Sequence, residues 1–391
     1  GFGIQKIEDG TISAGAVLHY LKETHHHLTK HISTISRIEQ EKYVWMDRFT
    51  IRNLELFYSS NENAKTLIDI LDFTLSAMGS RMIKRWVALP LKEKTQIDRR
   101  LEIVQFILNN KYFKDVLEEH IKSIGDLERL ISKVSTSRVS PRECNQLKIA
   151  LHSIHPIKES CENSNNNNIK IIGEQLNACK TISERIENTI TDNPPALVNK
   201  GNIIKEGVNT ELDELRQLSK SGKDYLQQIL ERETERTGIP SLKISFNNVF
   251  GYYLEVRNIH KEKVPEEWIR KQTLVSAERY ITEELKEYES KILSAEGKIL
   301  ELETRLYQDL VNSLSEYVVA IQTNSQLISQ LDCFYSFATI AKNNKYHKAT
   351  ISENTNILIK KGRHPVIEQQ LKSGESYIPN DTQLDRENQQ I

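Results

Sequence analysis

The sequence lacks the residue patterns that define several common protein classes. Its four cysteines form no CxxC pair and no metal-ligand spacing; they are Cys144, Cys161, Cys179 and Cys333. Reduced thiols in a cytoplasmic protein are therefore expected, with neither a disulfide framework nor a zinc site. No apolar run of about 18 residues occurs, so no membrane-spanning segment is predicted. Neither GxxxxGKS nor GxxxxGKT occurs, which excludes a phosphate-binding loop of that type within these residues.

The chain also lacks an excess of charge of either sign. Its 53 basic and 54 acidic residues exclude a globally basic nucleic-acid binder, but not a local basic contact surface. Gly and Pro are scarce, at 15 and 9 of 391 residues, whereas charged residues make up 27%. This composition is typical of a helix-rich protein with long solvated faces. The chain begins at Gly1 without a methionine or a signal peptide, which suggests a fragment of a longer protein.

What the sequence does contain is a pair of long amphipathic stretches on either side of a short alternating segment. The outgoing stretch covers about residues 205–236, and the returning one begins near Ser276 and extends to about Ala320. Apolar residues in the returning stretch are spaced 3 and 4 apart, at Leu285, Tyr288, Ile292, Ala295, Ile299, Leu302 and Leu306. The outgoing stretch carries Leu212, Leu215, Leu218, Leu226, Ile229 and Leu230. We predict two helices that pack as an antiparallel pair, the longer of them about 65 Å in length.

The segment between these stretches alternates like a β-hairpin. Alternate apolar residues flank Asn247–Asn248 on both sides: Leu242, Ile244 and Phe246 before it, and Phe250, Tyr252, Leu254 and Val256 after it. Asn tolerates positive φ, so this pair is predicted to form the turn. Trp268 and Leu274 are expected to cover one face of the hairpin. Residues 224–281 carry nine acidic and nine basic side chains, so anion binding here must come from their local arrangement.

Most of the remaining chain follows a helical pattern. A helix is predicted near 12–30, followed by a β-like stretch at 32–46 and an irregular or strand-like element at 46–57. A nearly continuous helical region then extends from Ala64 to His155, and Pro156 should close it. The polar run at 162–168 predicts a surface loop. From about residue 350 the pattern changes to strands, which predicts the beginning of another domain.

Five segments of the chain resemble the MutS family of DNA mismatch-repair proteins. They are LDFTLSAMGSRMIKRWVALPL (71–91), GDLERLISKVSTSRVSPREC (125–144), FNNVFGYYLEV (246–256), RKQTLVSAERYITEELKEYE (270–289) and GRHPVIE (362–368). Their order along essentially the whole chain makes the resemblance specific. It implies a mostly α fold: a helical core, two long antiparallel lever helices, a small β-containing clamp at their tip and a short β segment at the C-terminus.

The resemblance also implies a division into family domains. Residues 1–31 correspond to the end of the connector domain, 32–223 to the first part of the core and lever domain, and 224–281 to the clamp. Residues 282–349 correspond to the returning part of the lever, and 350–391 to the start of a truncated ATPase domain.

Membership of this family would imply a function for each part. The lever and clamp would grip the backbone of double-stranded DNA without sequence specificity and couple DNA binding to the ATPase domain. The intact protein would use ATP and Mg²⁺, form a homodimer and meet a MutL-type repair partner in the cytoplasm. Because no phosphate-binding loop occurs in these residues, the chain itself is expected to be no enzyme and to hold no cofactor.

The resemblance assigns two groups of candidate contact residues. Amide, hydroxyl, guanidinium and ammonium groups suit phosphate oxygens, and the matching clamp positions are Asn247, Asn248, Arg270, Lys271, Thr273 and Ser276. Three residues of the SYIPND stretch would meet the nucleotide base in the intact protein, namely Tyr377, Ile378 and Asn380. His364 in GRHPV is expected to support the local fold.

Two other interpretations stay open at this point. The paired helices could belong to a structural coiled-coil protein whose tip binds protein, or to a MutS paralogue that binds recombination junctions. The histidines at 25–27 and His31 include an i, i+4 pair, but no complete ligand set accompanies them, so no metal site is predicted. No spacing of Ser, His, Asp or Cys residues singles out a catalytic site.

Overall fold

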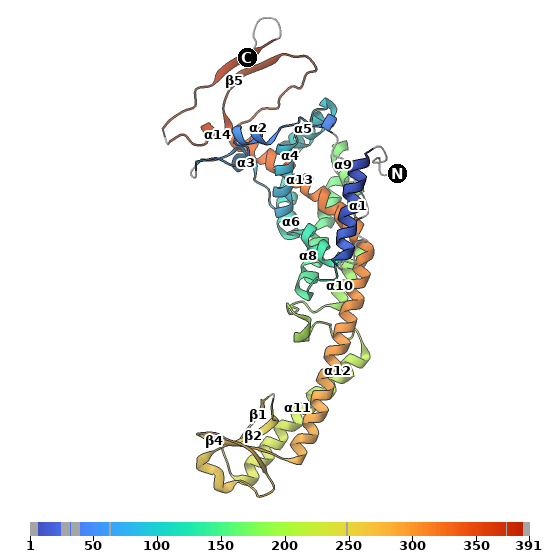
Figure 1. Ribbon diagram of the computed structural model, residues 1–391, viewed down its shortest axis with the longest axis vertical. Coiled ribbons are helices and arrows are strands. Elements are labelled where there is room, and N and C mark those ends of the chain that lie inside the picture. The colour runs from blue at the N-terminus through green and yellow to red at the C-terminus, as the bar shows by residue number, and fades with distance from the viewer. Residues whose placement is uncertain are drawn as a thin grey trace. The chain divides into compact units, whose positions relative to one another are not determined.

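The computed structural model in Figure 1 describes residues 7–24, 32, 40–61, 64–247, 249–372 and 374–385. These residues fall into two compact units, and each unit is described by itself. The helical unit lies within residues 1–139, 146–184 and 312–391, and the arm unit within 140–145 and 185–311.

The helical unit is built around α13, Val318–Asn344. This helix packs against α4 (Ala77–Ala88), α5 (Lys94–Asn109), α6 (Lys111–Ile124) and α7 (Leu127–Ser135). Most of its residues are buried, and Ile321, Ile328 and Leu331 have no exposed surface. Because four other helices pack against it, α13 forms the centre of this unit.

The other elements that lie wholly or partly in the helical unit are mostly short helices. They are α1 (Glu8–Glu23), η1 (Gln40–Lys42), α2 (Arg48–Asn53), α3 (Leu67–Leu71), α8 (Pro141–Glu162), α9 (Asn167–Gln175), α10 (Lys180–Thr189), η4 (Ser315–Tyr317) and α14 (Pro365–Glu368), with strands β5 (Ile357–Gly362) and β6 (Asn380–Leu384). The two strands pair antiparallel. Within the described part of the chain, no helix combines the length and apolarity needed to cross a bilayer.

A buried carboxylate on α13 holds the start of α4. Asp332 has no exposed surface, and its oxygens accept hydrogen bonds from Leu75 N at 2.8 Å, Ser76 N at 2.9 Å and the Ser76 hydroxyl at 2.7 Å. Burial raises the pKa of Asp332, and these hydrogen bonds oppose the shift. Gly79 leaves room for the carboxylate, because a Cβ there would lie 2.1 Å from Asp332 Oδ2.

The arm unit contains two long helices and a four-stranded sheet (Figure 1). α11 (Thr210–Thr237) begins where the Asn209 side chain accepts a hydrogen bond from Leu212 N, and it ends at Gly238, which adopts a φ of 59°. α12 comprises Glu283–Leu314. It begins later than the predicted start near Ser276, because Ala277–Ile281 form a strand instead of the first helical turns.

α11 and α12 pack as the predicted antiparallel pair. Their contacts advance along one helix and go back along the other: Arg216 pairs with Glu303, Lys223 with Glu296, and Arg232 with Glu284, while Tyr225 stacks on Tyr288. The predicted seam of α12 is buried at Leu285, Ile292, Ala295 and Leu302, each no more than 5% exposed.

The seam of α11 differs from the apolar pattern of its sequence. Leu218 is 53% exposed, whereas Ser219 and Gly222 are buried. A Cβ on Gly222 would lie 2.6 Å from Ile292 Cγ1, so the two helices approach closely at this point. The approach depends on small residues, which a count of large apolar side chains does not detect.

The sheet consists of β1 (Lys243–Asn247), β2 (Gly251–Arg257), β3 (Ile269–Thr273) and β4 (Ala277–Ile281), in the order β1-β2-β4-β3. All neighbours pair antiparallel. The predicted hairpin is β1–β2, and the second hairpin, β3–β4, is an addition to the prediction. One core cluster joins Leu254 and Val256 of the sheet to Leu226, Ile292 and, as predicted, Trp268.

Some local predictions are wrong or lie outside the described residues. Pro156 does not close a helix: α8 continues to Glu162, because Ile157 and Cys161 extend its buried face. The segment at 48–53 is helix α2, whose Asp47 cap accepts a hydrogen bond from Thr50 N at 2.7 Å. The polar run contributes only a short loop, since α9 begins at Asn167. Most of the β-like stretch, residues 33–39, is not described.

Replacing one glycine on each arm helix by alanine distinguishes the effect of packing between the helices from the effect of helix propensity on stability. Gly222→Ala forces a methyl group against Ile292, and we expect the free energy of unfolding to fall by about 1–3 kcal/mol. At Gly297 a Cβ meets no atom within 4 Å, so Gly297→Ala should raise the free energy of unfolding by up to about 1 kcal/mol. Urea unfolding of both variants measures the difference, and equal effects would contradict the close approach.

Candidate nucleic-acid interface

The strand register places the two turns of the four-stranded sheet at opposite ends; we call this sheet, β1 to β4, the clamp sheet after the region with which the resemblance aligns it. β1 and β2 meet at the pair Asn247–Gly251, whereas β2 and β4 are last paired at Arg257–Ala277, beside the β3–β4 turn. At ~3.4 Å per residue, the seven-residue strand β2 separates these ends by about 20 Å. The candidate phosphate contacts therefore form two groups instead of one.

The β3–β4 turn is a tight and exposed loop. Leu274 N donates to Ala277 O at 2.8 Å, which leaves Val275 and Ser276 as the two loop residues. Asn258 braces the loop from η3 (Asn258–Lys263): its N donates to Ser276 O at 3.1 Å and its Nδ2 to Val275 O at 2.9 Å. The Val275 side chain is fully exposed, so this end of the sheet is open to solvent. We call the end with the β3–β4 turn the turn end, and the other the β1–β2 end.

Free basic and hydroxyl groups gather toward the turn end. Arg257 ends β2, Thr273 ends β3 and Ser276 lies in the loop; all three are exposed. Lys271 is exposed on the edge strand β3, where the register shifts between Arg270 and Gln272. Among the residues described, neither Arg257 nor Lys271 has an ion-pair partner. Such groups are available for phosphate oxygens.

Arg270, by contrast, is engaged within the clamp. It forms an ion pair with Glu278 at 3.4 Å, and the Glu278 side chain is 10% exposed. Glu278 also accepts a hydrogen bond from the Tyr280 hydroxyl. Burial, followed by this hydrogen bond, raises the pKa of Tyr280 to about 12. Arg270 therefore neutralises a nearly buried carboxylate, which makes it a less available phosphate ligand than Lys271.

The opposite end of the sheet is held by an acidic residue of α12. Glu289 Oε2 accepts a hydrogen bond from Tyr252 N at 2.9 Å. The approach requires Gly251, which has a φ of 76° and whose Cβ would lie 2.0 Å from Glu289 Oε1. Asn247 uses its Oδ1 to accept a hydrogen bond from Val249 N at 2.7 Å within the turn. Asn248 lies outside the described residues.

The structure thus brings Thr273 and Ser276 together and places Asn247 at the other end of the sheet. It adds Arg257, which the sequence reasoning missed. Arg257 is the first exposed residue after the alternating run of β2, and a basic residue at the end of such a run was the available signal.

A network of arginines and carboxylates fixes the clamp to the arms. Arg232 bridges Glu233 and Glu284, and Arg236 bridges Glu233 and Glu267, the last of which precedes β3. Glu233 is only 6% exposed. Hydrogen bonds from Arg232 lower the pKa of Glu284, and those from Arg236 lower the pKa of Glu267. Side chains that are shared between two partners in this way restrict how the sheet can move on α11 and α12.

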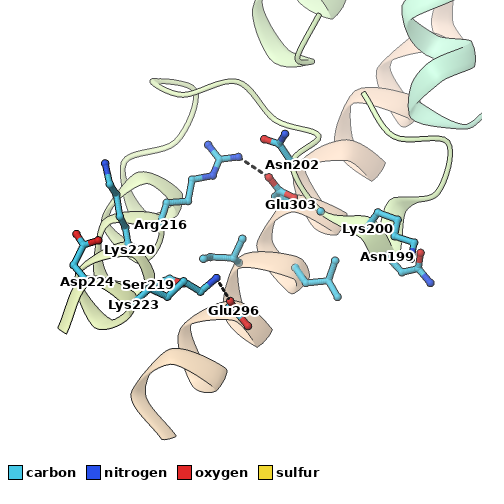
Figure 2. A pocket seen from close by; sticks show the side chains of 13 residues that line it. Asn199, Lys200, Asn202, Arg216, Ser219, Lys220, Lys223, Asp224, Glu296 and Glu303 are labelled. Carbon is cyan, nitrogen blue, oxygen red and sulfur yellow. Dashed lines mark hydrogen bonds and ion pairs between the residues drawn. The ribbon is translucent and has the colours of Figure 1, made fainter. Parts of the chain in front are cut away.

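A second set of ion pairs joins the arms farther from the clamp. Figure 2 shows Arg216 and Lys223 on α11 directed at Glu303 and Glu296 on α12, at 2.5 and 2.6 Å. They line a pocket of about 750 Å³ that also includes Lys200. Glu303 has no exposed surface, and its Oε2 has no hydrogen-bond partner in the described residues.

The loop before α11 closes over this buried carboxylate. η2 (Val198–Lys200) is followed by Gly201 and Asn202, which have φ values of 65° and 59°. A Cβ on Gly201 would lie 3.4 Å from Glu303 Oε2. Arg216 also donates to Ile204 O at 2.7 Å, so one guanidinium ties α11 to both the loop and α12.

The three candidate nucleotide-base residues follow β5 in the helical unit. Tyr377 is half-buried, Ile378 is 78% exposed, and Asn380 begins β6 opposite Gly362. His364 caps α14: its Nδ1 accepts hydrogen bonds from Val366 N and Ile367 N, both at 3.3 Å. This local structural role matches the expectation for His364.

The described residues contain no group of three or more His, Cys, Asp or Glu side chains that could hold a metal ion. The histidines at 25–27 and His31 are not among them. All four cysteines are free and buried. Burial raises the pKa of the Cys144 and Cys161 thiols to about 12, which keeps them protonated near neutral pH.

Removing Arg216 tests whether Glu303 depends on it. Arg216→Met leaves a buried carboxylate without its counter-charge, and we expect a loss of about 3–5 kcal/mol in the free energy of unfolding. The double variant Arg216→Met with Glu303→Leu removes both charges and should recover most of that loss. Denaturant unfolding of the two variants measures both free energies of unfolding. A double variant as unstable as the single one would contradict the pairing.

Comparison with known proteins agrees with this architecture. A sequence profile of MutS domain III matches residues 49–338. The chain is 55% identical to a DNA mismatch repair protein MutS of Bacteroides fragilis and 56% identical to that of Parabacteroides distasonis, in each case over all of this chain and 45% of the relative. For the Porphyromonas gingivalis protein of the same name the identity is 49%, over 44% of its length.

The chain therefore spans a little under half the length of these curated relatives. Because the profile covers well over half of the chain and the relatives match all of it, the chain belongs to the MutS family.

Proposed function

We propose that this chain is the core, lever and clamp part of a DNA mismatch-repair protein, with the domain limits that the resemblance implies. In this proposal the clamp holds the backbone of duplex DNA through its turn end. The observation that carries the proposal is the concentration of unpaired basic and hydroxyl groups there, at Arg257, Lys271, Thr273 and Ser276. The names of the relatives favour mismatch repair over recombination.

The charge distribution favours the turn end over the β1–β2 end as the part of the sheet that contacts DNA. The clamp region is neutral overall, with nine acidic and nine basic side chains. Its arginines 232, 236 and 270 are engaged by carboxylates, and Glu289 occupies the β1–β2 end. Duplex DNA carries closely spaced negative charge, so it favours the end with free cations over the end with a carboxylate.

The paired arms are the means by which DNA contact would reach the rest of the protein. A helix pair locked by Arg216–Glu303 and Lys223–Glu296 moves as a body, because packed interfaces have discrete arrangements and do not deform continuously. In the intact protein, ATP and Mg²⁺ would act through a nucleotide site to which Tyr377, Ile378 and Asn380 contribute. A homodimer and a MutL-type partner belong to the same proposal, whereas the chain alone is proposed to be no enzyme.

The proposal predicts that phosphate contacts contribute to the salt dependence of DNA binding. Log affinity for a fluorescent duplex should fall linearly with log salt concentration, without preference for sequence. Arg257→Gln and Lys271→Gln should each weaken binding at low salt and reduce the steepness of that line by about 0.9. Fluorescence anisotropy over a salt series measures both quantities.

A matched lysine on the arm provides the control for this titration. Lys298 is exposed on α12 and outside the clamp, so Lys298→Gln should leave the slope unchanged. Asn247→Ala tests whether the footprint that the resemblance implies reaches the opposite end of the sheet. Absence of binding even at low salt, with Arg257 and Lys271 intact, would favour the coiled-coil, protein-binding alternative.

A further inference from the structure

The helical unit contains a polar pocket that the proposed function does not use. It has a volume of about 660 Å³ and is lined by residues of α4, α5, α7 and α13 together with Tyr43. Three arginines face it, Arg81, Arg85 and Arg100, while Glu128 is its single acidic lining residue. The lining therefore has an excess of positive charge.

Arg100 is the innermost cation of this pocket. Its guanidinium carbon lies 3.6 Å from the centre of the Trp86 ring, so its flat face is covered while its N–H edge stays available. Burial lowers the pKa of Arg100, as expected for a cation without a counter-ion. Of the residues that the structure describes, none accepts a hydrogen bond from the Arg100 guanidinium or pairs with it through a carboxylate.

The other two arginines differ in their availability. Arg81 is satisfied, because it pairs with Asp126 at 2.8 Å and Glu128 at 2.5 Å. Asp126 also pairs with Arg129 at 3.3 Å, so two arginines balance the two carboxylates. Arg85 is exposed, and its side chain has no hydrogen-bond or ion-pair partner in the described part of the chain. Two guanidinium groups therefore remain free at one pocket.

α13 supplies neutral donors on the other wall. Gln322, Gln326 and Gln330 recur every four residues along α13 and line the pocket. Residues at this spacing lie on one face of a helix, so their amides form a row opposite the arginines. No hydrogen bond to their side chains is found among the described residues.

We infer that this pocket binds an oxyanion, specifically the phosphate group of a small molecule. Guanidinium groups meet phosphate through two parallel N–H···O bonds, and the glutamine amides can complete the coordination from the facing wall. The volume lies within the range of small-molecule sites. The half-buried and uncompensated Arg100 supports a ligand, because a buried cation without a partner is unfavourable.

Two neighbouring residues of α4 make a matched test. Arg85 lines the pocket and Lys84 does not, although both are exposed cations one residue apart. Isothermal titration calorimetry of the 391-residue chain with pyrophosphate, against sodium chloride of equal ionic strength, should show saturable one-to-one binding. Arg85→Gln should weaken that binding about five-fold or more, and Lys84→Gln less than about two-fold.

Melting temperatures show whether a variant binds less because it has lost the site or because it has lost its fold. Because the exposed Arg85 side chain makes no hydrogen bond or ion pair among the described residues, Arg85→Gln should melt at the same temperature as the wild type in the absence of anion. Pyrophosphate should raise the melting temperature of the variant less than that of the wild type. The inference is overturned if no saturable binding is found at pyrophosphate concentrations up to about 10 mM, a range that detects any dissociation constant below the millimolar range. Equal weakening by both variants also overturns it. If duplex DNA displaces pyrophosphate from the wild type but not from Arg85→Gln, the pocket binds DNA. That result would overturn the small-molecule assignment.

Discussion

The close approach of α11 and α12 is the constraint on which the arm unit depends. Because Gly222 has no side chain, the Ile292 side chain of α12 lies directly against the backbone of α11. The clamp sheet has no apolar core of its own, since Leu254 and Val256 bury themselves in the same cluster as Ile292 and Leu226. A small antiparallel sheet needs such a surface to be stable. The packing of the two arms therefore also determines where the clamp sits on them.

Charge is distributed along this unit so that packing and the proposed DNA contact use different residues. Carboxylates pair with the arginines at the base of the clamp and across the arms, at sites where burial makes an unpaired charge unfavourable. Among the cations left without an ion pair in the described residues, Arg257 and Lys271 are exposed toward one end of the sheet. A neutral domain can in this way present a local surface for a polyanion. The same rule, applied to the half-buried Arg100, supports the anion that we propose for the pocket in the helical unit.

The sequence was sufficient for the features that follow from regular periodicity. Apolar residues spaced 3 and 4 apart predict the α12 seam, and apolar residues at every second position predict the β1–β2 hairpin. Strand β4 was missed, because its residues lead directly into the strong helical pattern of α12. Ser219 and Gly222 were missed because small residues carry no apolar signal. The roles of Asp332 and Glu303 depend on partners 256 and 87 residues away in the chain, and the position of Arg257 beside Ser276 depends on strand register. Periodicity alone contains none of this information.

Native-state hydrogen exchange tests most directly whether the arms and the clamp sheet form one cooperative structure. Amides of α11, α12 and β2 would be followed at low and increasing denaturant concentrations. If the seam supports the sheet, the most protected amides of all three elements will converge on one opening free energy and one denaturant dependence. A sheet that opens at lower free energy while α11 and α12 stay protected would contradict the account, because the clamp would then be able to unfold without the arms.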